Sequence, residues 1–310
     1  MIADVATTRA EGIEAIARTL GARALRDEPL SRHTSFRIGG PADIYVRPDT
    51  IDDIRFVLRT ARECGLPVLP LGGGSNIVVR DGGVRGVVIR MMKNFDEMTV
   101  LGDGRVRARA GVTSAGLAFR MAELGLGGIE FAVGIPGTVG GGVITNAGAH
   151  GGDWGKLIES VEGITADGEP AHLSHDDLDF RYRHSAVPAG FVVTEATLRL
   201  EPGDAAKILA TTRGYLEDRR AKQPLNYPNA GCFFKNPAGA HAGQLIESAG
   251  LKGFRVGDLE VSEKHANFIV NLGGGTARDA LALVAEIRDR VHRAHGVWVE
   301  TEVMVVGEEA

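Results

Sequence analysis

Cysteine is scarce in this sequence, which has only Cys64 and Cys232 in a chain of 310 residues. Two cysteines cannot form the framework of disulfides that stabilises small secreted domains. Neither lies at a zinc-type spacing from a second cysteine or from a paired histidine. The sequence therefore predicts two reduced thiols and no metal site.

An excess of basic residues and a long apolar run are also missing. Lysine and arginine total 35 against 40 aspartates and glutamates, a net charge of −5, so the chain lacks the broad positive field of a nucleic-acid or anionic-membrane binder. An anionic ligand would need a local cationic pocket instead. No stretch approaches about 18 apolar residues, and Asp4, Glu11 and Glu14 stand where a signal peptide needs basic and then apolar residues. We therefore expect a cytoplasmic protein.

The two standard glycine templates for phosphate binding are absent, because the sequence contains neither G-x-G-x-x-G nor G-x-x-x-x-G-K-[ST]. This disfavours a Rossmann dinucleotide site and a P-loop. Glycine itself is abundant, at 43 residues, and two runs stand out: LGGGSN (Leu71–Asn76) and GIPGTVGGGVITNAGAHGG (Gly134–Gly152). Each run alone is more typical of a tight turn. Together, their successive backbone N–H groups favour a phosphate-bearing cofactor.

Mixed helix and strand patterns predict an α+β chain. The expected helices are an amphipathic one before residue 30, one from Asp204, and others at 50–65, 113–124, 244–249 and 276–296. The expected strands include a hairpin at 100–111, strands at 158–166 and 191–200, and a final strand at 297–306. The pattern changes after Pro202. We predict a helical extension at 1–30, a domain at 31–202 in two subdomains split near 95–100, and a domain at 203–310.

Two groups of basic residues are candidates for binding an anionic ligand. Arg183, in FRYRHS, follows an acidic helix start at 174–177, where a lone arginine is usually a surface ion pair. Arg219, Arg220 and Lys222 could hold a diphosphate by charge-assisted hydrogen bonds, or could simply complement a helix C-terminus. The residues themselves leave these alternatives open.

The C-terminal segment VWVETEVMVV places an acid among apolar residues. On an extended strand, Glu302 shares a face with Trp298, Glu300, Met304 and Val306. Burial of an unpaired carboxylate is costly, so an acid at such a position usually has a cationic partner or a chemical role. An edge strand with a solvated face explains the same pattern, and the strand pattern does not choose between them.

Seven motifs follow one another along the chain: HTSFRIGGPAD, LGGGSNIVV, GIPGTVGGGVITNAGAHGG, FRYRHS, NAGCFFKNP, SEKHANFIVN and VETEVMVVG. In this order they resemble the UDP-N-acetylenolpyruvoylglucosamine reductase family, over the chain from about residue 30 onward. The resemblance implies a two-part FAD-binding domain of the vanillyl-alcohol-oxidase-like type and an α+β substrate-binding domain. It also implies a cytoplasmic, NADPH-dependent flavoenzyme that reduces UDP-N-acetylglucosamine enolpyruvate to UDP-N-acetylmuramate in peptidoglycan precursor synthesis.

The resemblance further implies a role for each motif residue. Arg183 holds the substrate carboxylate and stabilises its enolate-like charge, Glu302 acts beside it in that stabilisation or in proton delivery, and Cys232 donates the proton. FAD is bound non-covalently, by Gly72, Gly73, Gly74, Ser75, Asn76, Gly134, Ile135, Pro136, Gly137, Thr138, Gly140, Asn146, Ala147 and Gly148. The UDP-sugar is bound by Arg219, Arg220, Lys222, Lys235, Asn236, Gln244 and Lys252. A monomer without nucleic-acid or membrane partners is expected.

The sequence departs from the family pattern at three points. Cys232 stands where serine is commoner, although an ordinary thiol, with a pKa of about 8.5, is largely protonated at neutral pH and is a stronger acid than a hydroxyl. His150 stands where a tyrosine is common. Only 49 positions separate Arg183 from Cys232, which indicates the shorter subgroup without an inserted tyrosine-bearing loop.

Two other functions are compatible with these motifs. One is a flavoprotein oxidase of the same cofactor fold, which would use oxygen as its acceptor. The other is a catalytically silent UDP-sugar-binding protein. The combination of Arg183, Cys232 and Glu302 argues against a protein without catalytic activity. The sequence leaves open the oligomeric state and the preference for NADPH over NADH.

Overall fold

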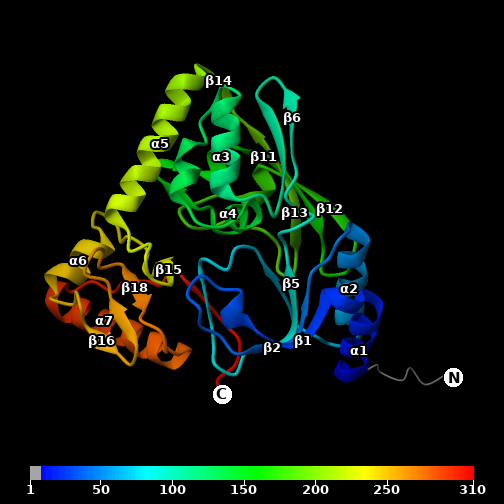
Figure 1. Ribbon diagram of the computed structural model, residues 1–310, viewed down its shortest axis with the longest axis horizontal. Helices are drawn as coiled ribbons and strands as arrows, with labels where there is room; N and C mark the ends of the chain where they lie inside the picture. The colour runs from blue at the N-terminus through cyan, green and yellow to red at the C-terminus, as the bar shows by residue number, and fades with distance from the viewer. Residues whose placement is uncertain (1–7) are drawn as a thin grey trace. The chain divides into compact units, whose positions relative to one another are not determined.

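The computed structural model describes residues 8–310, which form two compact units (Figure 1). Unit 1 comprises the segments up to Glu28, Ala42–Gly73 and Arg85–Leu216, and unit 2 comprises Pro29–Pro41, Gly74–Val84 and Glu217–Ala310. Each unit has its own hydrophobic core. The predicted α+β class is confirmed. The continuous domains at 31–202 and 203–310 stay a prediction, since each compact unit is assembled from several segments.

The first part of unit 1 is a four-stranded sheet packed against two helices. The strand order is β1-β2-β5-β3, with β3 and β5 parallel. The elements are α1 (Arg9–Leu20), β1 (Ala24–Pro29), β2 (Pro41–Val46), α2 (Ile51–Glu63), β3 (Val68–Leu71) and β5 (Val84–Arg90). Helices α1 and α2 lie side by side (Figure 1). Ile16 and Leu20 of α1 are buried, so the amphipathic helix expected before residue 30 is confirmed.

A capping box explains where α2 begins. The hydroxyl of Thr50 accepts a hydrogen bond from the backbone N–H of Asp53, and the Asp53 carboxylate accepts one from the N–H of Thr50. At the other end, Gly65 adopts a φ of +62°, which favours glycine and stops the helix. The predicted helix at 50–65 is therefore confirmed, with both of its end signals in place.

The second part of unit 1 is a five-stranded antiparallel sheet in the order β12-β11-β13-β7-β6. Its strands are β6 (Met98–Gly102), β7 (Arg105–Arg109), β11 (Ile158–Ile164), β12 (Pro170–Ser174) and β13 (Val192–Arg199). Along β7, Val106 and Ala108 are buried while Arg105 and Arg107 are exposed, because successive side chains point to opposite faces. The predicted hairpin with one wet face is confirmed.

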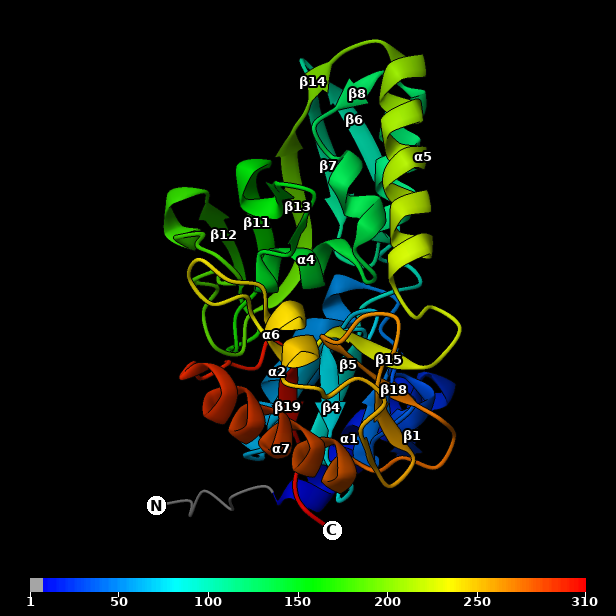
Figure 2. The same ribbon diagram turned by 90° about the vertical axis from the view of Figure 1, so that its left-hand side faces the viewer.

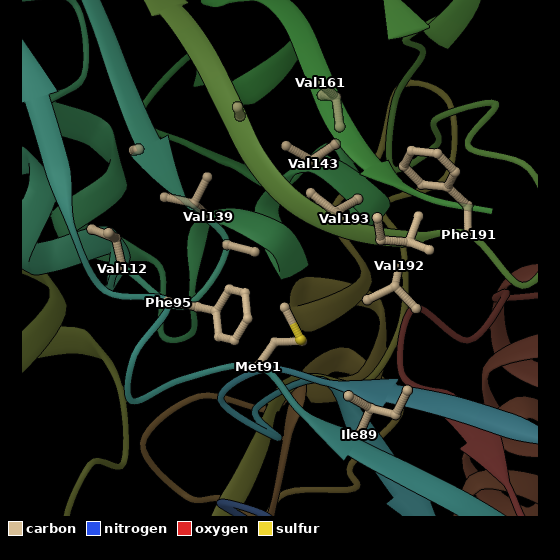
Figure 3. Close-up of a cluster of buried hydrophobic side chains, with 14 of the residues drawn as sticks. Ile89, Met91, Phe95, Val112, Val139, Val143, Val161, Phe191, Val192 and Val193 are labelled. Atoms are coloured by element: carbon tan, nitrogen blue, oxygen red, sulfur yellow. The ribbon is translucent and has the colours of Figure 1, made fainter. Parts of the chain in front are cut away.

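Helices and short strands complete unit 1. They are α3 (Ser114–Glu123), β8 (Leu126–Gly127), α4 (Val139–Thr145), β9 (Gly148–Ala149), β10 (Gly152–Asp153), β14 (Glu201–Pro202) and most of α5 (Ala205–Lys222). Helix α4 packs against β7 and β13. Figure 3 shows part of the core, where Met91 and Phe95, from the link after β5, lie among Val139, Val143 and Val193. One continuous core therefore joins both sheets of unit 1.

Unit 2 is a four-stranded antiparallel sheet with two helices, together with a separate pair of strands. The sheet order is β15-β18-β17-β16, formed by β15 (Asn229–Cys232), β16 (Arg255–Val256), β17 (Leu259–Val261) and β18 (Phe268–Asn271). The helices are α6 (Ala242–Ser248) and α7 (Ala277–His295), and α7 begins with a capping box at Thr276 and Asp279. The separate pair is β4 (Ile77–Val79) with β19 (Met304–Val306), parallel and side by side in Figure 2.

The structure corrects two predictions. The final strand at 297–306 is reduced to β19, because the chain changes partner: Thr301 forms a single bridge with Phe234, and only from Met304 does it pair with β4. Trp298 and Met304 are consequently exposed, and Glu302 is half-buried. The acidic helix start at 174–177 is only a 3-10 turn, Asp176–Leu178.

Candidate functional site

The two glycine runs meet within unit 1. A Cβ atom on Gly72 would lie 2.5 Å from the hydroxyl oxygen of Thr138, and one on Gly73 would lie 2.9 Å from the Cα atom of Gly137. Side chains at either position would separate the runs, which explains the glycines in physical terms. The backbones of two segments more than 60 positions apart are thus brought together.

Two buried hydroxyl groups at this meeting point fit a polar ligand. Within residues 8–310, the side-chain oxygens of Thr138 and Ser114 are buried and have no hydrogen-bond partner. Ser114 lies beside the same run, since its N–H donates to the carbonyl of Gly137 at 3.1 Å. Buried polar atoms normally have partners. The glycine backbones and these two hydroxyls are therefore suited to hold a ligand with many polar atoms, such as a flavin dinucleotide.

The other predicted cofactor residues are divided between the units. Gly134, Ile135, Pro136, Gly140, Ala147 and Gly148 belong to unit 1, whereas Gly74, Ser75 and Asn76 belong to unit 2. The first glycine run is thus the place where the chain passes from one unit to the other. Contacts between these residues and a cofactor stay a prediction.

Arg183 is fixed beside the second glycine run. It has a φ of +55°, a strained conformation for arginine, and its Nη2 donates to the carbonyl of Gly148 at 3.0 Å. The amide of Asn146 donates to the carbonyl of Arg181 at 2.8 Å and accepts from the N–H of Gly155 at 2.8 Å. Strain of this kind persists where the surroundings impose it, and it is common at functional sites.

Cys232 and Glu302 come together in unit 2. Cys232 is half-buried at the end of β15, and the N–H of Glu302 donates to the carbonyl of the next residue, Phe233, at 2.8 Å. A second backbone hydrogen bond runs from Lys235 N–H to the carbonyl of Glu300 at 2.9 Å. The backbones of two segments about 70 positions apart, one ending β15 and the other preceding β19, are therefore held together next to Cys232 and at Glu302.

The predicted substrate cations have different surroundings. Arg219 is in the last turns of α5, where burial lowers the pKa of its guanidinium and its Nε donates to Gln223. Lys222 forms an ion pair with Asp218 at 2.6 Å, i,i+4 on the same helix, and Arg220 lies between them in sequence. Of the three side chains, that of Arg219 is half-buried, whereas those of Arg220 and Lys222 are exposed. Their contacts with substrate stay a prediction.

The remaining predicted substrate residues also make local contacts. The Nζ of Lys235 lies 3.6 Å from Oε2 of Glu300, and the Nζ of Lys252 lies 2.7 Å from Oε1 of Glu247. The side chain of Asn236 accepts a hydrogen bond from the N–H of Ala242, the first residue of α6, and Gln244 lies on α6 itself. Asn236 therefore fixes the start of the helix that carries Gln244. Their contacts with substrate stay a prediction.

The ring of His150 has a partner that the motifs did not indicate. It stacks on Tyr215 of α5, with ring centroids 4.0 Å apart and ring planes 6° apart. The backbone of His150 also adopts a positive φ, +49°. Ser114 and Tyr215 were both missed by the sequence analysis, because neither belongs to a motif and only the folded chain shows their contacts.

Two absences hold for residues 8–310, the part of the chain that the structure describes. No cluster of three or more histidine, cysteine, aspartate or glutamate side chains has an arrangement that could hold a metal ion. No helix there has the length and apolar character to cross a membrane.

Comparisons with known proteins bear on both units. A family model described as "FAD binding domain" matches residues 42–174, and one described as "UDP-N-acetylenolpyruvoylglucosamine reductase, C-terminal domain" matches 223–306. The UDP-N-acetylenolpyruvoylglucosamine reductase of Geobacter metallireducens is 49% identical over 92% of this chain and 94% of its own. Reductase 2 of Symbiobacterium thermophilum is 49% identical over 96% of each chain.

A solved structure agrees with these matches. The crystal structure of the enzyme from Thermus caldophilus superimposes with a TM-score of 0.78, at 35% identity, over 92% of this chain and 98% of that one. The predicted cofactor, FAD, is confirmed by the matching domain. On this evidence, the chain belongs to the UDP-N-acetylenolpyruvoylglucosamine reductase family of FAD-binding oxidoreductases.

Proposed function

We propose that this chain reduces UDP-N-acetylglucosamine enolpyruvate to UDP-N-acetylmuramate, with NADPH as the source of hydride. The observation that carries the proposal is the hydrogen bond of 2.8 Å from Glu302 N–H to the Phe233 carbonyl, because it fixes the backbone of Glu302 next to Cys232, the proposed proton donor. Family membership supports the choice of substrate, since relatives of the same length carry that name. The preference for NADPH rests on the resemblance of the motifs.

When bound, FAD would supply the hydride chemistry between NADPH and the enolpyruvyl group. The residues that would hold FAD are the glycines where the two runs meet, with the hydroxyls of Thr138 and Ser114. The other requirements of the reaction are proposed to be met by side chains of the protein. They orient the substrate, stabilise its charge and supply one proton.

Arg183 is proposed to bind the substrate carboxylate. Its guanidinium is held by Gly148 beside the second glycine run, so its position is set before substrate binds. Negative charge grows on the carboxylate side of the enolpyruvyl group once hydride arrives. A fixed cation stabilises that charge more than it stabilises the ground state, which is the requirement for catalysis.

Cys232 is proposed to donate the proton to the carbon adjacent to the new C–H bond. A thiol is largely protonated at neutral pH and can donate in one step. Glu302, fixed to the next residue of the donor strand, is proposed to assist either by electrostatic stabilisation or by returning a proton to the thiolate. Each turnover then consumes one hydride and one proton.

The test is to follow the two half-reactions separately by anaerobic stopped-flow. NADPH should reduce the bound flavin, and UDP-N-acetylglucosamine enolpyruvate should then reoxidise it much faster than air does. Rapid reoxidation by air with none by the enolpyruvyl compound indicates a flavoprotein oxidase. No reduction by NADPH at all contradicts the proposed enzyme and leaves a UDP-sugar-binding protein.

Three further properties are also proposals. We infer a cytoplasmic, monomeric enzyme without nucleic-acid or membrane partners. The net charge of −5 supports the absence of a nucleic-acid partner. Size-exclusion chromatography with light scattering tests the monomer.

A further inference from the structure

Asn76 ends the first glycine run, and its side chain contacts Glu302. The Nδ2 of Asn76 donates to the backbone carbonyl of Glu302 at 3.3 Å, and the carbonyl of Asn76 accepts from the N–H of Met304 at 3.1 Å. All three residues belong to unit 2. Asn76 therefore holds the chain on both sides of Val303, whose side chain is buried.

The peptide groups on both sides of Glu302 are thereby fixed. Its N–H donates to Phe233, next to Cys232, and its carbonyl accepts from Asn76. Regular pairing of β19 with β4 begins only at Met304. Just before this pairing begins, the side-chain amide of Asn76 thus gives the carbonyl of Glu302 the hydrogen bond that a neighbouring strand would otherwise donate.

From this geometry we propose that Asn76 is a positioning residue, which aligns Glu302 for the reduction of the enolpyruvyl substrate, and that its amide is used for this and not for binding FAD. The inference rests on the proposed function. It changes the role that the sequence suggests for Asn76, since an amide that already donates to a backbone carbonyl has less capacity left for a cofactor.

The size of the effect follows from how sensitive catalysis is to alignment. A displacement of about 1 Å can cost up to about 100-fold in rate, and loss of one neutral hydrogen bond permits a smaller shift than that. We expect reoxidation of the reduced enzyme by the enolpyruvyl substrate to slow by about 5-fold to 20-fold when the amide donor is lost. Reduction by NADPH does not use Glu302 and should be unchanged.

The experiment uses the FAD-loaded enzyme and compares Asn76→Asp, Asn76→Ala and Glu302→Gln. Asn76→Asp keeps the shape but, when ionised, lacks the donor. Each variant is assayed for both half-reactions, for FAD affinity by titration of the apoprotein, and for hydrogen exchange of the peptide at 299–306. The double variant Asn76→Ala with Glu302→Gln tests whether the two residues act together.

The matched control is Asn271→Asp. Asn271 is also in unit 2, and its Nδ2 donates to the backbone carbonyl of Phe36 at 3.0 Å. This variant loses an equivalent amide donor at a carbonyl other than that of Glu302. It should lower the melting temperature while leaving the reoxidation rate per folded molecule, and hydrogen exchange at 299–306, within about twofold of the parent.

Four results support the proposal. FAD affinity and NADPH reduction stay within about twofold in both Asn76 variants, reoxidation slows, exchange at 299–306 accelerates, and the double variant is no slower than Glu302→Gln alone. The defect of Asn76→Asp should shrink relative to the parent as the pH falls toward about 4, the ordinary pKa of aspartic acid, because a protonated carboxyl group can donate again, whereas that of Asn76→Ala should not.

Other results overturn it. FAD binding weakened by tenfold or more, with both half-reactions slowed, makes Asn76 a cofactor ligand. If hydrogen exchange of the peptide at 299–306 is unchanged in the Asn76 variants, Asn76 does not fix this segment. If the parent enzyme is not reoxidised by the enolpyruvyl substrate, the proposed function fails and with it the catalytic purpose of Asn76, while exchange and FAD affinity still decide whether Asn76 fixes this segment.

Discussion

The two cysteines differ in their surroundings. Cys64 lies in the core of unit 1, and burial raises the pKa of its thiol. Cys232 is only half-buried, although the two phenylalanines that follow it, Phe233 and Phe234, are buried completely. A cysteine that served packing would be expected to point with its neighbours into the core. The position of Cys232 therefore favours chemistry over packing.

Substitution of Cys232 tests that interpretation. Cys232→Ala removes the proton donor and keeps a small apolar side chain, so reoxidation of reduced flavin by substrate should fall by at least about 100-fold, roughly 2.7 kcal/mol of barrier. Flavin reduction by NADPH should be normal. Cys232→Ser should retain much of the rate, because a hydroxyl can also donate. An alanine variant that turns over like the parent in stopped-flow assays contradicts the donor role.

His265 is linked to the segment after Cys232 through Asn267. Its Nδ1 accepts a hydrogen bond from the N–H of Asn267 at 3.2 Å. The Asn267 side chain in turn bonds both backbone groups of Phe234, at 3.0 and 2.8 Å. Burial, with a smaller effect from Lys252, lowers the pKa of His265 below its ordinary value of 6.5. Protonation of Nδ1 would end its acceptance of the Asn267 N–H.

This lowered pKa predicts acid sensitivity. Below about pH 6.5 the unfolded chain binds a proton at His265 that the folded protein resists, so the free energy of unfolding falls as the pH decreases toward the folded pKa. His265→Gln keeps an acceptor and should flatten this slope between about pH 7 and 5.5. Denaturant unfolding at each pH measures it. At about pH 8 the imidazole is neutral in both states, so a difference between parent and variant confined to that pH contradicts the prediction.

At the scale of elements, helix α4 is one that propensity alone excludes. Its sequence VGGGVIT contains three glycines, each costing about 1 kcal/mol relative to alanine. Tertiary packing reverses the preference, because Gly142 is buried against the indole ring of Trp154 and a side chain there would overlap the ring. From the sequence this glycine run is typical of a tight turn, because no local pattern reports packing against Trp154.

Two neighbouring glycines of α4 should respond to alanine in opposite ways. Gly141 is exposed, and a Cβ atom there meets only the Thr138 hydroxyl at 3.9 Å, so Gly141→Ala should raise the free energy of unfolding by about 0.5–1 kcal/mol. Gly142→Ala must displace Trp154 and should lower it by about 1–3 kcal/mol. Chemical denaturation of the FAD-loaded proteins measures both. Stabilisation by both substitutions would show that packing against Trp154 does not select glycine.

The elements that could be predicted are those with local signals. Capping boxes at Thr50 and Thr276 mark the starts of α2 and α7, and the sequence predicts helices at both places, 50–65 and 276–296. The final strand was predicted as too long because alternation reports which side chains share a face, but not which partner the backbone pairs with. Thr301 and Met304 pair with different segments, and no local pattern records that change.

At the scale of the whole molecule, the motifs name candidate residues but do not say where these residues lie in the fold. The resemblance named Cys232 and Glu302, but their link through Phe233 depends on folding of segments about 70 positions apart. Nor does composition reveal that Pro29–Pro41 and Gly74–Val84 belong with the C-terminal part in unit 2. Such non-local pairings are determined by tertiary packing, which periodicity and capping do not report.

Each unit contains one of the two tryptophans of the chain. Trp154, in unit 1, is fully buried, and its ring lies against α4. Trp298, in unit 2, is 52% exposed and stacks on His292 at 4.2 Å. The variants Trp298→Phe and Trp154→Phe therefore leave one fluorescent reporter each, in unit 1 and unit 2 respectively.

These reporters predict an unequal response to the cofactor. Eleven of the fourteen predicted FAD residues lie in unit 1, because only Gly74, Ser75 and Asn76 fall in unit 2. FAD at about 100 times its Kd should stabilise a protein that binds it only when folded by about 2.7 kcal/mol. We expect the unfolding transition reported by Trp154 to shift by about this amount, and the one reported by Trp298 to shift by less than half of it. Denaturant titrations of both variants, with and without FAD, measure the two shifts. Equal shifts in both variants would mean that the units unfold together, and that the cofactor stabilises the chain as one cooperative whole.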